Sequence, residues 1–161
     1  MRSDRPKNDH SYGGSNGGKC VFCEQPIISK PLRSTKDILA CLEIFRDKKQ
    51  EYFVTLSLDG AGNLILRRIV TIGLLDVSLA HPREVFAGPL TDRAANVIIA
   101  HNHPSGMAEP SSEDIKTTQQ LIAAGILLGI PLRDHVIVTK SGYFSFRERG
   151  LIYHQELTSS D

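Results

Sequence analysis

The sequence has few cysteines and no long apolar run, and each shortage excludes a class of protein. Cys20, Cys23 and Cys41 are an odd and sparse set, so we expect no structural disulfides and a reducing compartment. No apolar stretch approaches the roughly 18 residues that cross a bilayer, and the polar N-terminal residues lack the apolar core of a signal peptide. We therefore expect a soluble, cytoplasmic protein with no membrane partner.

The sequence also has no marked excess of positive or negative charge. Lysine and arginine number 19 and aspartate and glutamate 18, a net charge of +1, so the overall balance gives little support for a nucleic-acid partner. The sequence does contain 40% apolar residues, enough for one buried core. We predict one domain over residues 32–152, preceded by a flexible Gly/Ser-rich tail with a CxxC over 1–31 and followed by a C-terminal tail over 153–161.

Three segments carry the periodicity or the boundary residues of helices. The helices are predicted to run from Ser34 to about Lys48, from Pro82 to about Ala95, and from Ser111 to Gly129. Both serines begin capping boxes, STKD and SSED, and Gly129 is placed to stop the third helix. The apolar face expected for that helix consists of Ile115, Leu121, Ile122, Ile126 and Leu127.

Between these segments lie runs rich in β-branched and aromatic residues, which predict strands. The runs are EYFVTLSLD at 51–59, LILRRIVTI at 64–72, NVIIAHN at 96–102, and two more within 131–146. The turn at 60–63 predicts a hairpin between the first two. Helices alternating with strands, some of which are joined by short turns, predict an α/β domain with a mixed β-sheet flanked by helices.

The stretch AHNHPSGMAEPSSED contains the residues of a candidate metal site. His101 and His103 are two residues apart at the end of a predicted strand, so their side chains project to the same side. A hydrolytic zinc site needs three protein ligands and one position open to water, and a carboxylate is a common third ligand. Asp114 is the natural candidate, because Ser111 caps a helix whose first turn holds it near the histidines.

Less specific interpretations stay open for each half of this stretch. Ser-x-x-Asp is also a structural capping box, and two histidines in a loop are often only solvated. Other histidine motifs fit less well. HExxH is absent from the sequence, the amidohydrolase barrel needs about 250 residues, and the three residues of HNH nucleases are dispersed through a ββα unit.

The arrangement His-x-His-x(7)-Ser-x-x-Asp resembles the JAMM motif of the MPN+ (JAB) metalloprotease superfamily. The form HNHPSG, with HPREVF upstream and DHVIV downstream, resembles the RadC-like branch in particular. The resemblance implies a JAB/MPN domain with a cytidine-deaminase-like fold. Longer RadC-like members have a helix-hairpin-helix segment ahead of this domain, whereas this sequence has a Gly-rich segment with a CxxC there, and we expect a short form.

The resemblance also implies a role for each motif residue. His101, His103 and Asp114 would bind Zn²⁺ with the fourth position open to water, and Ser111 would hydrogen-bond the oxyanion. The family's general base is a glutamate on the first core strand, which Glu51 matches, and Glu84 is the competing candidate. The implied activity is zinc-dependent hydrolysis of peptide or isopeptide bonds in a protein or peptide substrate.

Two further functions and two further sites are weighed against this one. A DNA-associated accessory protein is the alternative function, because RadC-like proteins have a historical association with DNA repair, and a catalytically silent interaction module is the third. Cys20 and Cys23 could form half of a zinc ribbon, but the second pair is missing, and only Cys41 and His10 could complete four ligands. Asp134 and His135 also match the RadC-like pattern, and we interpret them as a structural pair outside catalysis.

Overall fold

The computed structural model describes residues 23–24, 31–73 and 81–152. Most of the predicted N-terminal tail, including Cys20, and the whole predicted C-terminal tail lie outside the described residues. Within the described part of the chain, Cys23 and Glu24 pair with Arg68 and Arg67 of a longer strand. None of the described helices is long and apolar enough to cross a membrane.

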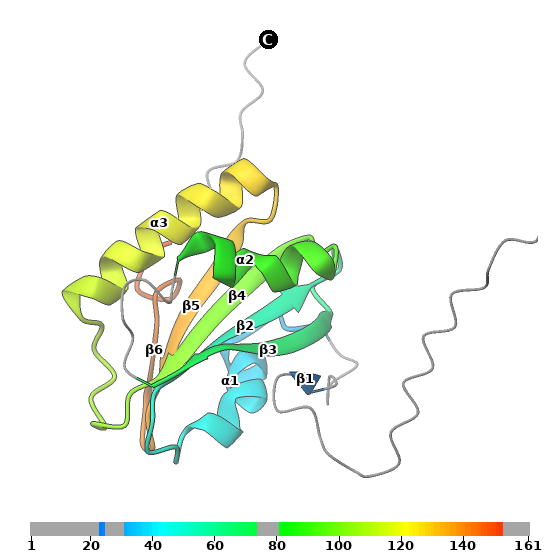
Figure 1. The fold of residues 1–161 in the computed structure, drawn as a ribbon. Coiled ribbons are helices and arrows are strands. Elements are labelled where there is room, and N and C mark those ends of the chain that lie inside the picture. The colour runs from blue at the N-terminus through cyan, green and yellow to red at the C-terminus, as the bar shows by residue number, and fades with distance from the viewer. Residues whose placement is uncertain (1–22, 25–30, 74–80, 153–161) are drawn as a thin grey trace, which may run out of the picture.

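A six-stranded sheet forms the centre of the domain, in the order β1-β3-β2-β4-β5-β6 (Figure 1). The strands are β1 (Cys23–Glu24), β2 (Tyr52–Leu58), β3 (Leu64–Ile72), β4 (Asn96–Asn102), β5 (Leu132–Val138) and β6 (Tyr143–Ser145). Among the strands of the described residues, only β4 and β5 pair in parallel, because the chain crosses over through a helix between them. The predicted hairpin of β2 and β3 is confirmed.

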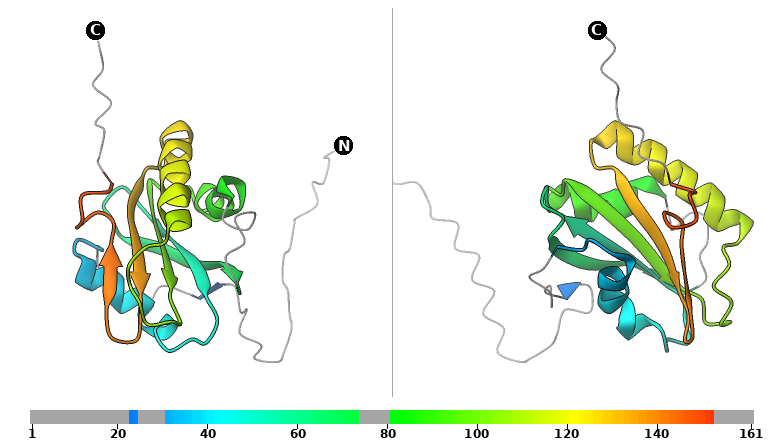
Figure 2. Two further views of the ribbon diagram at one scale, coloured as in Figure 1. Left: turned by 90° about the vertical axis from the view of Figure 1, so that its left-hand side faces the viewer. Right: turned by 180° about the vertical axis from the view of Figure 1, so that it is seen from behind.

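Helices cover both faces of this sheet. They are α1 (Thr35–Leu42), the 3-10 helix η1 (Glu43–Phe45), α2 (Pro82–Thr91) and α3 (Ser112–Leu128). Helices α2 and α3 lie on one face and α1 lies on the other, as the views in Figure 1 and Figure 2 show together. The predicted class, an α/β domain with a mixed sheet flanked by helices, is therefore confirmed.

Side-chain alternation along the strands divides the core into two clusters. Ile98 and Ala100 of β4 join the cluster under α1, whereas Val97 and Ile99 join the cluster under α2 and α3. Because both faces are covered, β4 is buried over most of its length and reads as a nearly continuous apolar run. The same alternation directs His101, two residues after Ile99, toward the α3 side of the sheet.

Two helices end earlier than the sequence predicted. The first was expected to reach Lys48, but α1 gives way after Leu42 to η1, which turns Phe45 into the core. The second was expected to reach Ala95, but α2 ends at Thr91. Arg93 then takes a positive φ of 52°, which a helix interior does not allow.

The third helix has the predicted capping serine and stop glycine but a different buried face. Its buried residues are Asp114, Thr118, Leu121 and Gly125. Of the predicted apolar face, Leu127 is 88% exposed, Ile126 42% and Ile115 39%, so that part of the prediction is wrong. The buried face instead includes Gly125, where a Cβ would lie 2.7 Å from the Ile130 carbonyl oxygen. A Cβ there would also lie 3.3 Å from the Leu132 backbone nitrogen of β5, so a glycine lets this turn of α3 approach the strand closely.

Candidate metal centre

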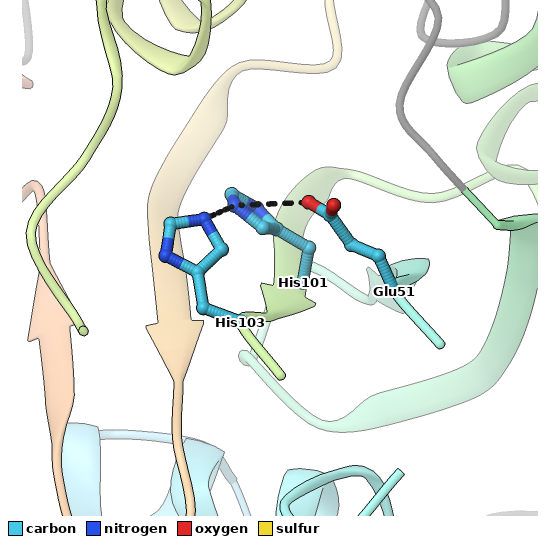
Figure 3. A group of neighbouring side chains, drawn as sticks. All are labelled: Glu51, His101 and His103. Carbon is cyan, nitrogen blue, oxygen red and sulfur yellow. Dashed lines mark hydrogen bonds and ion pairs between the residues drawn. The ribbon is translucent and has the colours of Figure 1, made fainter. Parts of the chain in front are cut away.

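Strand pairing brings Glu51 and His101 together across 50 residues of sequence. In the antiparallel register of β2 and β4, Phe53 lies opposite His101. Glu51 comes two residues before Phe53, so it projects from the same face of the sheet, beside His101. Its carboxylate oxygen Oε1 lies 3.7 Å from His101 Nε2 (Figure 3).

Asn102, between the two motif histidines, anchors the segment that carries Glu51 through side-chain hydrogen bonds. Its side-chain oxygen accepts from the Tyr52 backbone N–H at 2.8 Å, and its amide nitrogen donates to the carbonyls of Gln50 at 3.0 Å and Lys48 at 3.4 Å. The residue is fully buried, so these bonds are shielded from water. Sequence reasoning missed this role; the signal was an asparagine at the end of an apolar strand, on the face opposite His101.

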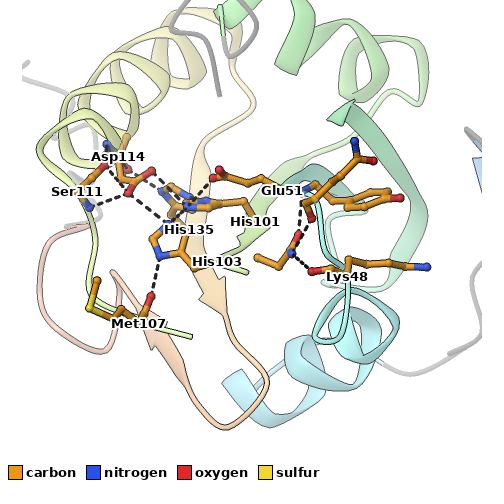
Figure 4. Close-up of polar contacts among 12 residues, drawn as sticks. Lys48, Glu51, His101, His103, Met107, Ser111, Asp114 and His135 are labelled. Carbon is orange, nitrogen blue, oxygen red and sulfur yellow. Dashed lines mark hydrogen bonds and ion pairs between the residues drawn. The ribbon is translucent and has the colours of Figure 1, made fainter. Parts of the chain in front are cut away.

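Three further atoms converge on the point that Glu51 faces. His101 Nε2 lies 2.9 Å from His103 Nε2 and 3.2 Å from Asp114 Oδ1, and His103 Nε2 lies 3.7 Å from Asp114 Oδ2 (Figure 4). The His101 side chain is completely buried, whereas the side chains of Glu51 and His103 are 19% and 17% exposed. The centre therefore has a closed floor at His101 and an open side at Glu51 and His103.

The helix that follows the histidine loop supplies Asp114. Ser111 caps α3: its Oγ accepts from the Asp114 backbone N–H at 3.1 Å and donates to Asp114 Oδ2 at 2.7 Å. The Ser111 backbone N–H donates to the same oxygen at 2.7 Å. The capping box and the candidate site are thus one structure, because the capping contacts aim the carboxylate at the histidines.

The loop after His103 fixes the orientation of that ring. His103 Nδ1 lies 2.8 Å from the Met107 carbonyl oxygen. A carbonyl can only accept, so Nδ1 carries the hydrogen and Nε2 of the neutral ring presents a lone pair to the centre. Gly106 in this loop has a φ of +86°, a conformation that glycine allows without strain.

The charges of the centre depend on one another. Burial alone raises the pKa of Asp114, but the side-chain contacts of its carboxylate with His101, His103 and Ser111 outweigh burial and hold that pKa well below its usual range. The contact with the Asp114 carboxylate raises the pKa of His103. Burial raises the pKa of Glu51, although the nearby histidines oppose the shift. The result is an ionised Asp114 beside a glutamate biased toward accepting a proton.

The donor set fits a metal ion. Glu51, His101 and His103 each offer one ligand atom, and these atoms lie within 4.8 Å of one another. Among the residues that the structure describes, this is the one group of three or more histidine, cysteine, aspartate or glutamate residues that could hold a metal ion. Asp114 adds carboxylate oxygens 3.2 Å and 3.7 Å from the two imidazole nitrogens. Imidazole nitrogens and carboxylate oxygens are ligands that zinc and other divalent transition metals accept. A bound cation would balance these converging lone pairs and the negative charge of Asp114.

The structure separates the other candidates from this centre. Glu84 is exposed and forms an ion pair with its neighbour Arg83 on α2, with Glu84 Oε1 3.1 Å from Arg83 Nε. Cys23 is in β1, on the far side of β3 and β2 from the histidine strand. All five residues predicted for the site lie in or against the cluster: Glu51, His101, His103, Ser111 and Asp114.

The predicted pairing of Asp134 with His135 is wrong. Adjacent residues of β5 project to opposite faces, and Asp134 accepts hydrogen bonds from Ser145 Oγ at 2.7 Å and the Arg147 backbone N–H at 3.0 Å. His135 lies on the α3 side, where its Nε2 is 2.9 Å from His101 Nδ1. It is fully buried, and burial holds its pKa well below the ordinary value. His135 therefore lies directly behind a candidate ligand.

The mixed sheet, the crossover helix and the Glu-His-His-Asp cluster define an α/β domain with a candidate metal centre of the JAB kind. Residues 32–151 match the family described as RadC-like JAB domain. The chain belongs to this family.

Curated relatives support the assignment but are longer. A UPF0758 protein of Methanospirillum hungatei is 55% identical over 105 residues, which are 65% of this chain and 47% of that protein. A UPF0758 protein of Methanosarcina acetivorans is 41% identical over 133 residues, which are 82% of this chain and 57% of that protein. A UPF0758 protein of Geotalea uraniireducens is 45% identical over 108 residues, which are 67% of this chain and 47% of that protein. The chain thus spans about half the length of these relatives.

Proposed function

We propose that this chain is a zinc-dependent hydrolase of the JAMM type that cleaves peptide or isopeptide bonds. The observation that carries the proposal is the convergence of Glu51, His101, His103 and Asp114 on one partly open point. His101, His103 and Asp114 are the proposed ligands, and Glu51 stays free for proton transfer. Zinc, when bound there, lowers the pKa of water toward about 7 and polarises a substrate carbonyl.

Glu51 is the proposed general base. Its carboxylate lies beside the ligand His101 but outside the ligand set, where it can take a proton from the attacking water and deliver it to the leaving amine. The raised pKa of Glu51, which burial causes, suits a group that must both accept and release a proton near neutrality. The buried bonds of Asn102 hold the backbone on either side of it.

Replacing Glu51 by Gln tests this role. The amide keeps the size of the side chain but cannot accept the proton, so we expect zinc content to stay at about one per chain and cleavage to fall by about 10²- to 10⁴-fold. The measurement is turnover of a mixture of synthetic peptides and isopeptides, read by mass spectrometry, together with metal analysis.

Glu84→Gln is the matched control, because Glu84 is an exposed glutamate paired with Arg83, away from the cluster. This variant should keep the parent rate. Cleavage by Glu51→Gln at the parent rate would remove Glu51 from the mechanism, and metal-free parent protein from a purification without chelators would remove the metal from the proposal.

A DNA-associated role is the second candidate, and one observation favours it. A groove beside the centre is lined by His103 and Pro104 together with four cationic residues and one acidic residue: Arg46, Lys48, Lys49, Lys140 and Asp47. Cationic side chains of this kind contact phosphates in nucleic-acid complexes. The same groove also fits an acidic protein segment approaching the centre.

Salt dependence separates the two candidates. If DNA is the partner, duplex or single-stranded DNA should bind with an affinity that falls steeply between about 50 and 200 mM salt. The triple variant Lys48→Ala, Lys49→Ala, Lys140→Ala should weaken that binding and flatten its salt slope. We expect only weak DNA binding, since the net charge of the chain is +1. Tight, salt-sensitive binding that the triple variant loses would reverse the ranking of the two functions.

A further inference from the structure

A line of buried hydrogen bonds runs from the back of the candidate centre into helix α3. His101 Nδ1 lies 2.9 Å from His135 Nε2, and His135 Nδ1 lies 2.7 Å from Thr118 Oγ1. Thr118 Oγ1 in turn lies 2.6 Å from the backbone carbonyl oxygen of Asp114. Part of this line, behind the labelled His101, appears in Figure 4. All four residues are buried, so water does not compete for these bonds.

The carbonyl at one end gives the line a direction. A carbonyl oxygen only accepts, so the single hydroxyl hydrogen of Thr118 points to Asp114. The Thr118 oxygen must then accept from His135 Nδ1–H, because it has no second hydrogen to give. A neutral imidazole carries one N–H, so His135 Nε2 is an acceptor and His101 Nδ1 must be the donor.

We propose that Thr118 and His135 are positioning residues that hold His101 in the tautomer whose Nε2 lone pair faces the metal centre. The proposal rests on the proposed metal site for its purpose, but the direction of the hydrogen bonds follows from the contacts alone. His101 needs a positioning partner more than His103 does, because its ring is completely buried and no loop carbonyl contacts its Nδ1 in the described contacts. His103 has the Met107 carbonyl in the equivalent place.

Aromatic contacts keep the His135 ring in the plane that the line requires. Phe146 stacks on it with ring centroids 4.6 Å apart and planes at 12°, and Phe53 meets it edge-on at 6.0 Å. Phe53 also stacks on His101, with centroids 6.0 Å apart and planes at 13°. The two imidazoles therefore cannot rotate without displacing core side chains.

The line also connects two proposed ligands. It begins at the ring of His101 and ends on the backbone of Asp114, the residue whose carboxylate lies 3.2 Å from the opposite nitrogen of that ring. Thr118 is one turn after Asp114 on α3, so the same helix presents the carboxylate and anchors the line. Rotation or sliding of α3 would therefore disturb both ligands together.

The direct test is the tautomer of His101 in metal-free protein, measured by long-range ¹H–¹⁵N NMR of histidine-labelled chain. We expect His101 and His135 both to carry their hydrogen on Nδ1. Thr118→Val keeps the shape but removes the hydroxyl, so His101 should become a mixture of tautomers. Thr118→Ser keeps the hydroxyl and should restore the parent spectrum. An Nε2–H tautomer of His101 in the parent protein would overturn the proposal.

Zinc affinity, measured by competition with a chromophoric chelator, is the second readout. Loss of an outer partner of a metal-bound histidine typically lowers affinity about 10- to 100-fold, which we expect for Thr118→Val, whereas Thr118→Ser should stay within about 3-fold of the parent. Ser145→Ala is the control for simple loss of a buried hydroxyl, because Ser145 bonds Asp134 on the other side of β5. It should lower stability and leave zinc affinity unchanged.

These outcomes separate this proposal from the proposed hydrolase function. Absence of peptide cleavage by the parent protein would count against the hydrolase and leave the tautomer and the affinity ratios unaffected. Equal zinc affinities for Thr118→Val and Thr118→Ser would overturn the positioning role even if the parent protein cleaves peptides.

Discussion

Ser111 has one hydroxyl hydrogen and two proposed uses for it. In the structure that hydrogen goes to Asp114 Oδ2 at 2.7 Å, which completes the capping box of α3. In the proposed reaction the same hydroxyl donates to the oxyanion as the tetrahedral intermediate forms. The two uses are compatible if the hydroxyl rotates away from Asp114 during the reaction, and a comparison with a second capping box in the same chain can separate them.

Ser34 provides that comparison. It caps α1 with the same reciprocal contacts, donating to Asp37 Oδ2 at 2.7 Å and accepting from the Asp37 backbone N–H at 3.3 Å. We expect Ser34→Ala and Ser111→Ala each to lower the free energy of unfolding by about 1 kcal/mol. Only Ser111→Ala should also lower kcat, by about 10²- to 10³-fold, because it alone removes an oxyanion donor.

Chemical denaturation, zinc analysis and peptide cleavage measured on both variants check this prediction. If Ser111→Ala loses stability as Ser34→Ala does but keeps kcat and zinc, then Ser111 is a capping residue only.

The residues of the centre differ in how far the sequence could predict them. His101, His103, Ser111 and Asp114 lie within 14 positions, so their spacing alone suggests a site. Glu51 could be named only by resemblance, since its place beside His101 depends on the pairing of β2 with β4. Asn102 was missed and His135 was given the wrong partner, because their actual partners are 50 and 34 residues away and no local pattern marks such contacts.

At the scale of elements, strands were easier to predict than the packing of α3. The strand at 96–102 has the predicted bounds, since a short apolar run buried on both faces has few alternatives. The buried face of α3 could not be read from hydrophobicity, because its contacts with the sheet include a small residue and two polar ones, Gly125, Asp114 and Thr118. Both polar residues contact buried histidines of the candidate centre or behind it: Asp114 Oδ1 lies 3.2 Å from His101 Nε2, and Thr118 Oγ1 lies 2.7 Å from His135 Nδ1.

Gly125→Ala therefore has an expected effect opposite to the usual one. Alanine in place of glycine normally stabilises a helix by about 0.5 to 1 kcal/mol. Here the added Cβ would lie 2.7 Å from the Ile130 carbonyl oxygen and 3.2 Å from Phe86 Cζ. We expect Gly125→Ala to lower the free energy of unfolding by about 1 to 3 kcal/mol, measured by denaturant titration.

Leu127→Ala and Leu121→Ala complete the test of this helix face. Leu127 is 88% exposed, so its truncation should change stability by no more than about 0.5 kcal/mol. Leu121 is fully buried, and its truncation should cost about 2 to 5 kcal/mol. A large loss at Leu127 with a gain at Gly125 would mean that the helix packs by the face that hydrophobicity predicts.

At the scale of the whole molecule, the candidate centre joins segments that the sequence keeps apart. Glu51 lies just before β2, His101 and His103 lie at the end of β4, and Asp114 lies in the first turn of α3. An ion held by these residues binds the folded chain and has no comparable site once the segments separate. Zinc should therefore stabilise the fold by linkage, in proportion to its occupancy.

The expected size of this effect follows from the ligand concentration. At free zinc about 100 times its dissociation constant, linkage adds about 2.7 kcal/mol, which for a domain of this length raises Tm by roughly 5 to 10 °C. His103→Ala should abolish the shift, whereas His81→Ala should keep it, because His81 is an exposed histidine that caps α2 away from the centre. The double variant Cys20→Ser, Cys23→Ser should also keep it. A zinc-dependent rise in Tm that survives His103→Ala and disappears with the two cysteines would place the metal at the CxxC and leave the histidine centre without its ion.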